Sequence, residues 1–412
     1  MGLAKPTGSQ AIMSEIEIRD PTGGVNQSGV RDHNERLVLS LIQRHGALPS
    51  ADVARRAGLS AQTVSIIIRS LEKDGLLRRG EAVKGKVGKP SVPVTLDPDG
   101  ILSLGLNIGR KSADLVLIDP LGTVRAQIKS TYAYPAPEVM MRFLAAGFAQ
   151  IKATLTARQC GKLAGIGVAA PFELWNWLEA VHAPKEEMAR WKDFDLAGTV
   201  GEITDMPVYV QNDATAACTA ELLFGRGREF SDYAYFFIGS FVGGGVVLND
   251  AVYVGRSGNS AAFGSLPVRL GQPDGAPGQG QLLHNASIYL LEQRLEAAGL
   301  DPTAIWSPDH DWEGFGAILP DWIAHTARHL AIAVVAVSAV IDFERILIDA
   351  NCPPEVLERL ISATRKEIKG LDTRGIAAPV ILSASVGRNA RAIGAASLPI
   401  IARFLLSQSR FS

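Results

Sequence analysis

Short amphipathic segments characterise the N-terminal quarter of the chain. Apolar residues recur at helical spacing from Asp32 to Gly46, and Ser50 is expected to cap a short helix at 51–57. Ser60 is expected to cap a third helix that ends near residue 74. This helix has one apolar face, made by Val64, Ile67, Ile68 and Leu71. Two short helices separated by three residues predict a helix-turn-helix.

A glycine- and lysine-rich loop follows this motif. Residues 76–79 and 91–96 are predicted as two strands that flank the loop, which is the outline of a wing. An aperiodic, flexible tail is expected at 1–28, and a linker lies near 97–100. The pattern therefore predicts a winged helix-turn-helix domain at 29–97. The lysines of the wing are Lys84, Lys86 and Lys89.

Strand and helix patterns alternate through the rest of the chain. A helix is predicted at 140–155. Strands are predicted at 101–108, 114–119, 124–132, 163–169, 208–210, 233–238 and 244–248. Such alternation is typical of an α/β domain in which helices pack on sheets, here covering 98–412.

Charge is distributed unevenly along the 412 residues. The formal net charge is -1, yet residues 31–92 contain 12 Lys and Arg against 6 Asp and Glu, and the remainder contains 29 against 36. A basic module attached to an acidic body is typical of a protein that binds nucleic acid at one end. The length suits two or three domains.

The cysteines and the hydropathy of the chain indicate the cellular compartment in which we expect the protein. The three cysteines are far apart and odd in number, so we expect neither a disulfide framework nor a paired metal site. The first thirty residues lack the layout of a signal peptide. The longest apolar stretch, 322–341, contains two histidines and an arginine, which favours a buried helix over a membrane span. We therefore expect a cytoplasmic protein without membrane association.

The third helix is expected to enter the major groove of double-stranded operator DNA. Gln62 suits adenine, and Arg69 suits guanine or the backbone. The wing lysines suit phosphates, which add affinity without reading sequence. A winged helix used only for protein contacts is the competing interpretation. The predicted DNA-binding residues are Ser60, Gln62, Thr63, Ser65, Arg69, Lys84, Lys86 and Lys89.

Six stretches of the large domain, taken in order, resemble the ROK family. They read GLNIGRKSADLVLIDPLG, GIGVAAPFELWNW, VYVQNDATAACTAELLFG, IGSFVGGGVVLND, GNSAAFGS and ARAIGAASLPIIARF. That family groups repressors and sugar kinases of the actin-like ATPase fold, and the winged helix matches its repressor branch. The resemblance implies two lobes, the first at about 98–213 with the C-terminal helix and the second at about 214–388.

The chain departs from the family's kinases at the nucleotide and zinc positions. Their first strand turn, an Asp followed by two Gly and a Thr, holds a phosphate of ATP. Here Asn107 and Arg110 replace the Asp and the second Gly, which puts nucleotide binding in doubt. The family's Glu-x-Gly-His becomes Ala262 to Ser265 and its zinc-binding cysteines are missing, so we expect no metal and no cofactor. The glycines at 243–245 fit either a tight turn or phosphate contact.

The resemblance also implies a sugar site. Asn212-Asp213 matches the family's Asn-Asp pair, in which Asp is the catalytic base; here we expect a vestigial base that binds sugar hydroxyls and also caps the helix 214–224. Trp175 would stack on a sugar or else belong to the core. Lys185 would favour an anionic ligand or else be a solvated surface residue. The predicted ligand-binding residues are Glu173, Trp175, Asn176, Lys185, Asn212, Asp213 and Ser265.

Together these features predict a DNA-binding regulator, a repressor of carbohydrate genes, controlled by a sugar in a non-catalytic cleft. Closure of the lobes would shift paired winged helices, so a homodimer or a dimer of dimers is expected. The helices near 325–340 and 389–406 are candidates for its interface. Two alternatives stay open: an active sugar kinase that carries a DNA-binding domain, and a scaffold with an empty cleft that responds to a partner protein.

Overall fold

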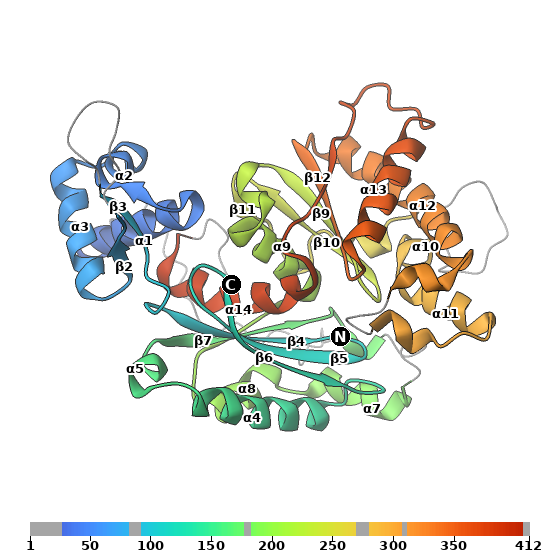
Figure 1. Ribbon diagram of the computed structural model, residues 1–412, viewed down its shortest axis with the longest axis horizontal. Helices are drawn as coiled ribbons and strands as arrows, with labels where there is room; N and C mark the ends of the chain where they lie inside the picture. Colours follow the sequence, from blue (N-terminus) through green and yellow to red (C-terminus); the bar gives the residue numbers. More distant parts are fainter. Residues whose placement is uncertain (1–26, 82–91, 177–182, 269–279, 307–310, 407–412) are drawn as a thin grey trace, which may run out of the picture. The chain divides into compact units, whose positions relative to one another are not determined.

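The computed structural model describes residues 27–81, 92–176, 183–268, 280–306 and 311–406 (Figure 1). The chain divides into two units, of which the first contains residues 1–210 and 395–412 and the second contains 211–394. Most of the predicted N-terminal tail lies outside the described residues. So do the wing lysines Lys84, Lys86 and Lys89.

Three helices and a small sheet form the N-terminal domain. They are α1 (Gln27–His45), α2 (Ser50–Ala57) and α3 (Ala61–Lys73), with an antiparallel sheet in which β3 (Pro93–Leu96) pairs with β1 (Leu48–Pro49) and β2 (Leu77–Arg79). The predicted apolar face of α3 is buried. Gly58 ends α2 in the left-handed conformation, with φ of 65°, which turns the chain between α2 and α3.

The starts of the helices differ in part from the prediction. Ser60 caps α3 as predicted, because its Oγ accepts a hydrogen bond from the backbone N–H of Thr63 at 3.1 Å. The predicted cap at Ser50 is wrong: Ser50 is the first residue of α2, and Pro49 precedes it without a side-chain hydrogen bond. α1 begins at Gln27, inside the segment predicted as a tail.

A five-stranded sheet of order β6-β5-β4-β7-β8 is the centre of the first unit. The central strand β4 is buried along its whole length and runs parallel to β7 and antiparallel to β5. Helices α4 and α8 cover one face of the sheet (Figure 1). The strands are β4 (Leu102–Ile108), β5 (Ser112–Ile118), β6 (Val124–Thr131), β7 (Leu163–Ala170) and β8 (Val208–Asn212), and the helices are α4 (Pro137–Ala153), α5 (Ala157–Cys160), α7 (Lys185–Ala189) and α8 (Leu196–Thr204).

The second unit contains another five-stranded sheet, of order β11-β10-β9-β12-β13. Its strands are β9 (Tyr233–Ile238), β10 (Val242–Leu248), β11 (Ala251–Val252), β12 (Arg345–Ala350) and β13 (Ile381–Ser383). Its helices are α9 (Asp213–Phe224), α10 (Leu283–Ala286), α11 (Tyr289–Ala297), α12 (Ile318–Val340) and α13 (Pro354–Ile368). By length and composition alone α12 could cross a membrane. Its buried residues, among them Trp322 and Leu330, instead belong to the apolar core of this unit, as predicted.

The last helix, α14 (Ala390–Phe404), begins in the second unit and continues in the first. Within the first unit it lies against β7, on the face of the sheet opposite α4 (Figure 1). Glycines make this approach close: a Cβ at Gly167 would overlap the carbonyl of Ala395, and one at Gly165 would lie 3.3 Å from the side chain of Pro399. Only glycine allows the helix and the strand to meet at this distance.

Candidate DNA-binding and ligand-binding sites

The outer side of α3 carries exposed side chains of the kind that read DNA. Gln62, Ser65 and Arg69 are exposed, whereas Thr63 is half-buried. The hydroxyls of Ser60 and Thr63 lie 2.8 Å apart, so these two predicted DNA contacts also hold the start of the helix. Sequence reasoning assigned no role to Ile66, which is 54% exposed beside them. An apolar residue on the polar side of the helix was the signal, because a thymine methyl group suits such a side chain.

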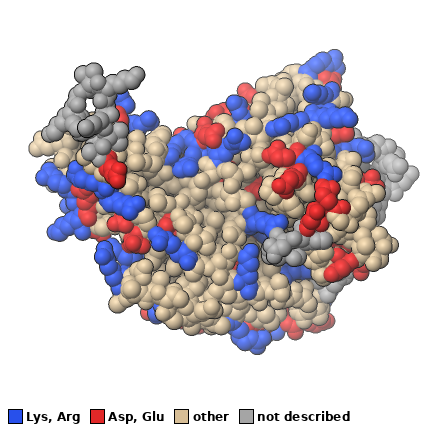
Figure 2. Space-filling model, in the orientation of Figure 1, with Lys and Arg blue, Asp and Glu red and all other residues tan. Residues whose placement is uncertain are grey.

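Exposed basic side chains lie on the elements next to this helix, and Figure 2 shows basic and acidic groups intermixed over the N-terminal domain. Arg55 and Arg56 of α2 are exposed, and Arg55 pairs with Asp52 at 2.8 Å. On β2, Arg78 is exposed and Arg79 pairs with Glu72 at 2.7 Å. Such arginines suit the phosphate backbone, which fixes the position of a protein on a duplex.

Asn212 and Asp213 form the start of α9. The predicted cap at Asp213 is wrong by one residue, because the side chain of Asn212 accepts from the backbone N–H groups of Ala214 at 3.0 Å and Thr215 at 3.2 Å. Asp213 is the first helical residue, and its Oδ2 lies 3.4 Å from Nη1 of Arg391. The two side chains are 19% and 14% exposed, so this ion pair is largely shielded from water.

The first strand turn of the large domain differs in chemistry from a magnesium site. Asn107, at the end of β4, is 1% exposed, and its Oδ1 finds no hydrogen-bond partner among the described residues. Arg110 is also buried, with 7% exposure. A hydrogen bond of 2.7 Å from the Tyr132 hydroxyl to the Gly109 carbonyl holds the turn. A neutral amide and a guanidinium group are therefore the buried polar side chains that these two residues place at this turn, and neither is a carboxylate.

The glycines at 243–245 lie inside β10 and not in the tight turn that was one of the two predictions. Close packing accounts for them. A Cβ at Gly243 would lie 2.8 Å from the Cβ of Ala214, and one at Gly245 would collide with Cys218, both on α9. The helix can approach the strand only because these side chains are missing.

The other predicted ligand-binding residues lie on three separate segments. Glu173 is exposed with φ of 49°, and Trp175 follows it in the 3-10 helix η1 (Leu174–Asn176), where its ring is half-buried against the core of the first unit. Lys185 is exposed at the start of α7. In the second unit, Ser265 is exposed at the end of the 3-10 helix η4 (Phe263–Ser265), which contacts β10. The side chain of Asn176 lies outside the described residues.

The second unit also contains buried titratable groups. Tyr235 donates a hydrogen bond of 2.8 Å to Oδ2 of Asp349, and burial raises the pKa of Asp349 to about 6. On α12, burial and the neighbouring His329 lower the pKa of His325 to about 4. Within the described part of the chain, no three His, Cys, Asp or Glu residues gather closely enough to hold a metal ion.

Comparison with known sequences assigns both parts of the chain. Residues 31–78 match a winged helix-turn-helix DNA-binding domain, and residues 103–401 match the ROK family. The xylose repressor of Bacillus spizizenii is 25% identical over 248 residues, which cover 60% of this chain and 64% of that protein. The DNA-binding transcriptional dual regulator NagC of Escherichia coli is 23% identical over 282 residues, 66% of this chain and 68% of that protein.

A solved structure supports the same assignment at the level of the fold. The crystal structure of a ROK family transcriptional regulator, a homolog of the E. coli MLC protein, aligns with a TM-score of 0.66 and 21% identity, covering 90% of this chain and 96% of that one. The chain therefore belongs to the ROK family, with a winged helix-turn-helix ahead of an actin-like sugar-kinase fold.

Proposed function

We propose that this protein represses genes of carbohydrate uptake or catabolism and is controlled by a sugar or sugar derivative bound at a non-catalytic kinase-like site. One observation carries the proposal: a winged helix with exposed polar side chains on α3 precedes a ROK domain whose first strand turn contains Asn107 and Arg110. The names of the related xylose repressor and NagC support a regulator of this kind.

The same turn argues against phosphoryl transfer. Magnesium is bound through carboxylates and phosphate oxygens, and the amide of Asn107 supplies no negative charge. The side chain at Arg110 occupies a position where the backbone would have to approach a phosphate closely. Asp213 would then accept hydrogen bonds from sugar hydroxyls without acting as a base.

Helix α14 offers a path from the sugar to the DNA-binding domain. Its first turn contains Arg391, which pairs with Asp213. Beyond its other end, the backbone N–H of Leu406 donates a hydrogen bond of 2.8 Å to Oγ of Ser40 on α1. A sugar that takes up the hydrogen-bonding capacity of Asp213 would release Arg391 and shift α14, and with it α1. The sugar can change the affinity for DNA by no more than the difference in its own affinity for the two positions of α14.

The proposal includes a homodimer or a dimer of dimers in the cytoplasm. Paired winged helices match the two-fold symmetry of operators with two half-sites. Val340, at the end of α12, is 81% exposed, which supports α12 as part of a subunit interface. Glu173, Trp175 and Lys185 are proposed as further sugar-binding residues.

Fluorescence anisotropy with labelled fragments from upstream of the protein's own gene and its neighbours tests DNA binding. We expect one fragment to bind specifically, and Arg69→Ala to lower that affinity by about tenfold, the loss expected for one base contact. Arg158→Ala is the matched control, since Arg158 is exposed on α5, outside the DNA-binding domain. Equal loss in both variants, or none in either, would contradict the assignment of α3.

A further inference from the structure

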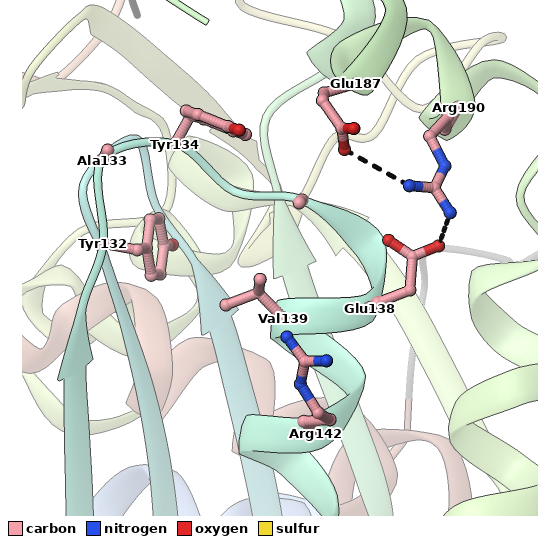
Figure 3. Close-up of a pocket in the computed structure, with 9 residues that line it drawn as sticks. Tyr132, Ala133, Tyr134, Glu138, Val139, Arg142, Glu187 and Arg190 are labelled. Carbon is pink, nitrogen blue, oxygen red and sulfur yellow. Dashed lines mark hydrogen bonds and ion pairs between the residues drawn. The ribbon is translucent and has the colours of Figure 1, made fainter. Parts of the chain in front are cut away.

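The first unit contains a cavity of about 490 Å³ that the proposed sugar site does not use (Figure 3). It is formed by the loop after β6, the first turns of α4, the helix α7 and the start of the 3-10 helix η2 (Arg190–Asp193). Ligand pockets typically have volumes of about 300–1,000 Å³, so a molecule the size of a monosaccharide fits. The side chains that matter here are Tyr132, Tyr134, Glu138, Arg142, Glu187 and Arg190.

The charges around the cavity are unevenly paired. Arg190 donates to Glu138 and, at 3.3 Å, to Glu187, so one arginine serves two carboxylates (Figure 3). Arg142 lies one helical turn after Glu138, the spacing at which the two would ordinarily pair. Because Glu138 is turned toward Arg190, Arg142 has no hydrogen bond or ion pair with any described residue. Among the described residues that line the cavity, Arg142 is thus a cation available to a ligand, beside two carboxylates with further acceptor capacity.

Two aromatic rings complete the wall. Tyr132 and Tyr134 are both half-buried. Tyr132 is held at both ends, since its hydroxyl donates to the Gly109 carbonyl at 2.7 Å and its backbone N–H donates to the Lys111 carbonyl at 3.0 Å. A tyrosine combines apolar ring surface with a polar tip, which suits a ligand that is itself partly apolar and partly hydroxylated.

We propose that this cavity binds a sugar acid, that is, a hydroxylated ring with one carboxylate. Arg142 binds the carboxylate, because guanidinium groups match carboxylate geometry through two hydrogen bonds. The oxygens of Glu138 and Glu187 accept hydrogen bonds from hydroxyls, and the tyrosine rings pack against the ring of the ligand. The site is distinct from Asp213 and does not depend on DNA binding. Through Tyr132 it is linked to the turn that contains Asn107 and Arg110.

Isothermal titration calorimetry of the full chain with D-glucuronate and D-galacturonate tests the site, with D-glucose and D-galactose as neutral counterparts. We expect at least one of the two acids to bind, with at least tenfold higher affinity than its neutral counterpart. Arg142→Gln should lower that affinity at least tenfold, and Tyr134→Ala should also lower it. Arg158→Gln, which changes another exposed arginine of the same unit, should leave it unchanged.

Three results would overturn the proposal: no binding of either acid at 10 mM, equal affinity for acid and neutral sugar, or unchanged affinity in Arg142→Gln. Asp213→Asn separates this cavity from the proposed effector site. Acid binding that survives Asp213→Asn supports the cavity, whereas acid binding that disappears with Asp213→Asn assigns the acid to the other site. The calorimetry contains no DNA, so a negative result would overturn this cavity proposal and leave the proposed repressor function intact.

Discussion

Asp213→Asn gives the sharpest perturbation of the proposed effector site. Asn keeps the shape of the side chain and an oxygen that can accept from the Ala214 backbone N–H, which lies 2.9 Å from Asp213 Oδ1. What it removes is the negative charge that faces Arg391 at 3.4 Å. The experiment therefore isolates the carboxylate without creating a cavity.

The magnitude follows from the surroundings of the pair. Both side chains are less than one-fifth exposed, so the hydrogen bond between them is charge-assisted and poorly screened, worth about 1.5–3 kcal/mol. A negative charge at the first position of α9 adds about 0.3–1 kcal/mol through the helix dipole. The free energy of unfolding should fall by roughly 2–4 kcal/mol. The loss of one charge-assisted acceptor should lower sugar affinity by roughly 10- to 150-fold.

Two assays measure these effects. Urea denaturation gives the stability, and operator binding followed by fluorescence anisotropy during titration with D-xylose, D-glucose and N-acetyl-D-glucosamine gives the response to sugar. Asp205→Asn is the matched control: Asp205 is exposed in the left-handed conformation, which Asn also tolerates, and should change stability by less than about 0.5 kcal/mol. If Asp213→Asn retained the stability and sugar response of the parent, the role assigned to this pair would be refuted.

Further variants test other parts of the account. Gly243→Ala places a Cβ 2.8 Å from the Cβ of Ala214 and should lower the free energy of unfolding, measured by urea denaturation, by about 1–3 kcal/mol. Gly370→Ala, at an exposed glycine, should cost little, and equal effects of the two variants would contradict the packing explanation. His325, whose pKa is lowered to about 4 in the folded state, binds fewer protons there than in the unfolded chain. Its contribution to stability is therefore present above pH 6.5 and lost as the pH falls toward 4. His325→Gln should make the decline of Tm with falling pH less steep than in the parent, and parallel curves would refute this. Replacing Lys84, Lys86 and Lys89 by Gln should weaken binding to all duplexes and reduce its salt dependence, and an unchanged salt slope would remove them from the interface.

Local patterns in the sequence were enough to predict many elements of the fold, though not all of them. The apolar stripe of α3 and the cap at Ser60 depend on residues within one or two turns, and both were predicted correctly. The strands from residue 101 to 248 were likewise visible, although their boundaries moved by a few residues, whereas β12, α13 and β13 were not predicted. The two helix caps that were predicted wrongly, Ser50 and Asp213, each lie one residue after the observed cap. The local preferences that decide which of two adjacent residues begins a helix are nearly balanced.

Features that depend on tertiary packing could not be predicted in the same way. The glycines at 243–245 looked compatible with a turn because the sequence does not show that α9 lies against β10. The cavity beside Arg142 is formed by two stretches that are distant in sequence, residues 132–142 and 187–190. The ion pair of Glu138 with Arg190, which joins the two stretches, therefore had no recognisable spacing in the sequence.

The most direct test of the central claim is the affinity of the purified protein for its upstream DNA, measured at low ionic strength with and without each sugar of the panel. We predict specific binding that at least one sugar changes about tenfold or more, which corresponds to a coupling free energy of about 1.4 kcal/mol. A protein that bound no fragment of its genomic surroundings under any of these conditions would contradict the account.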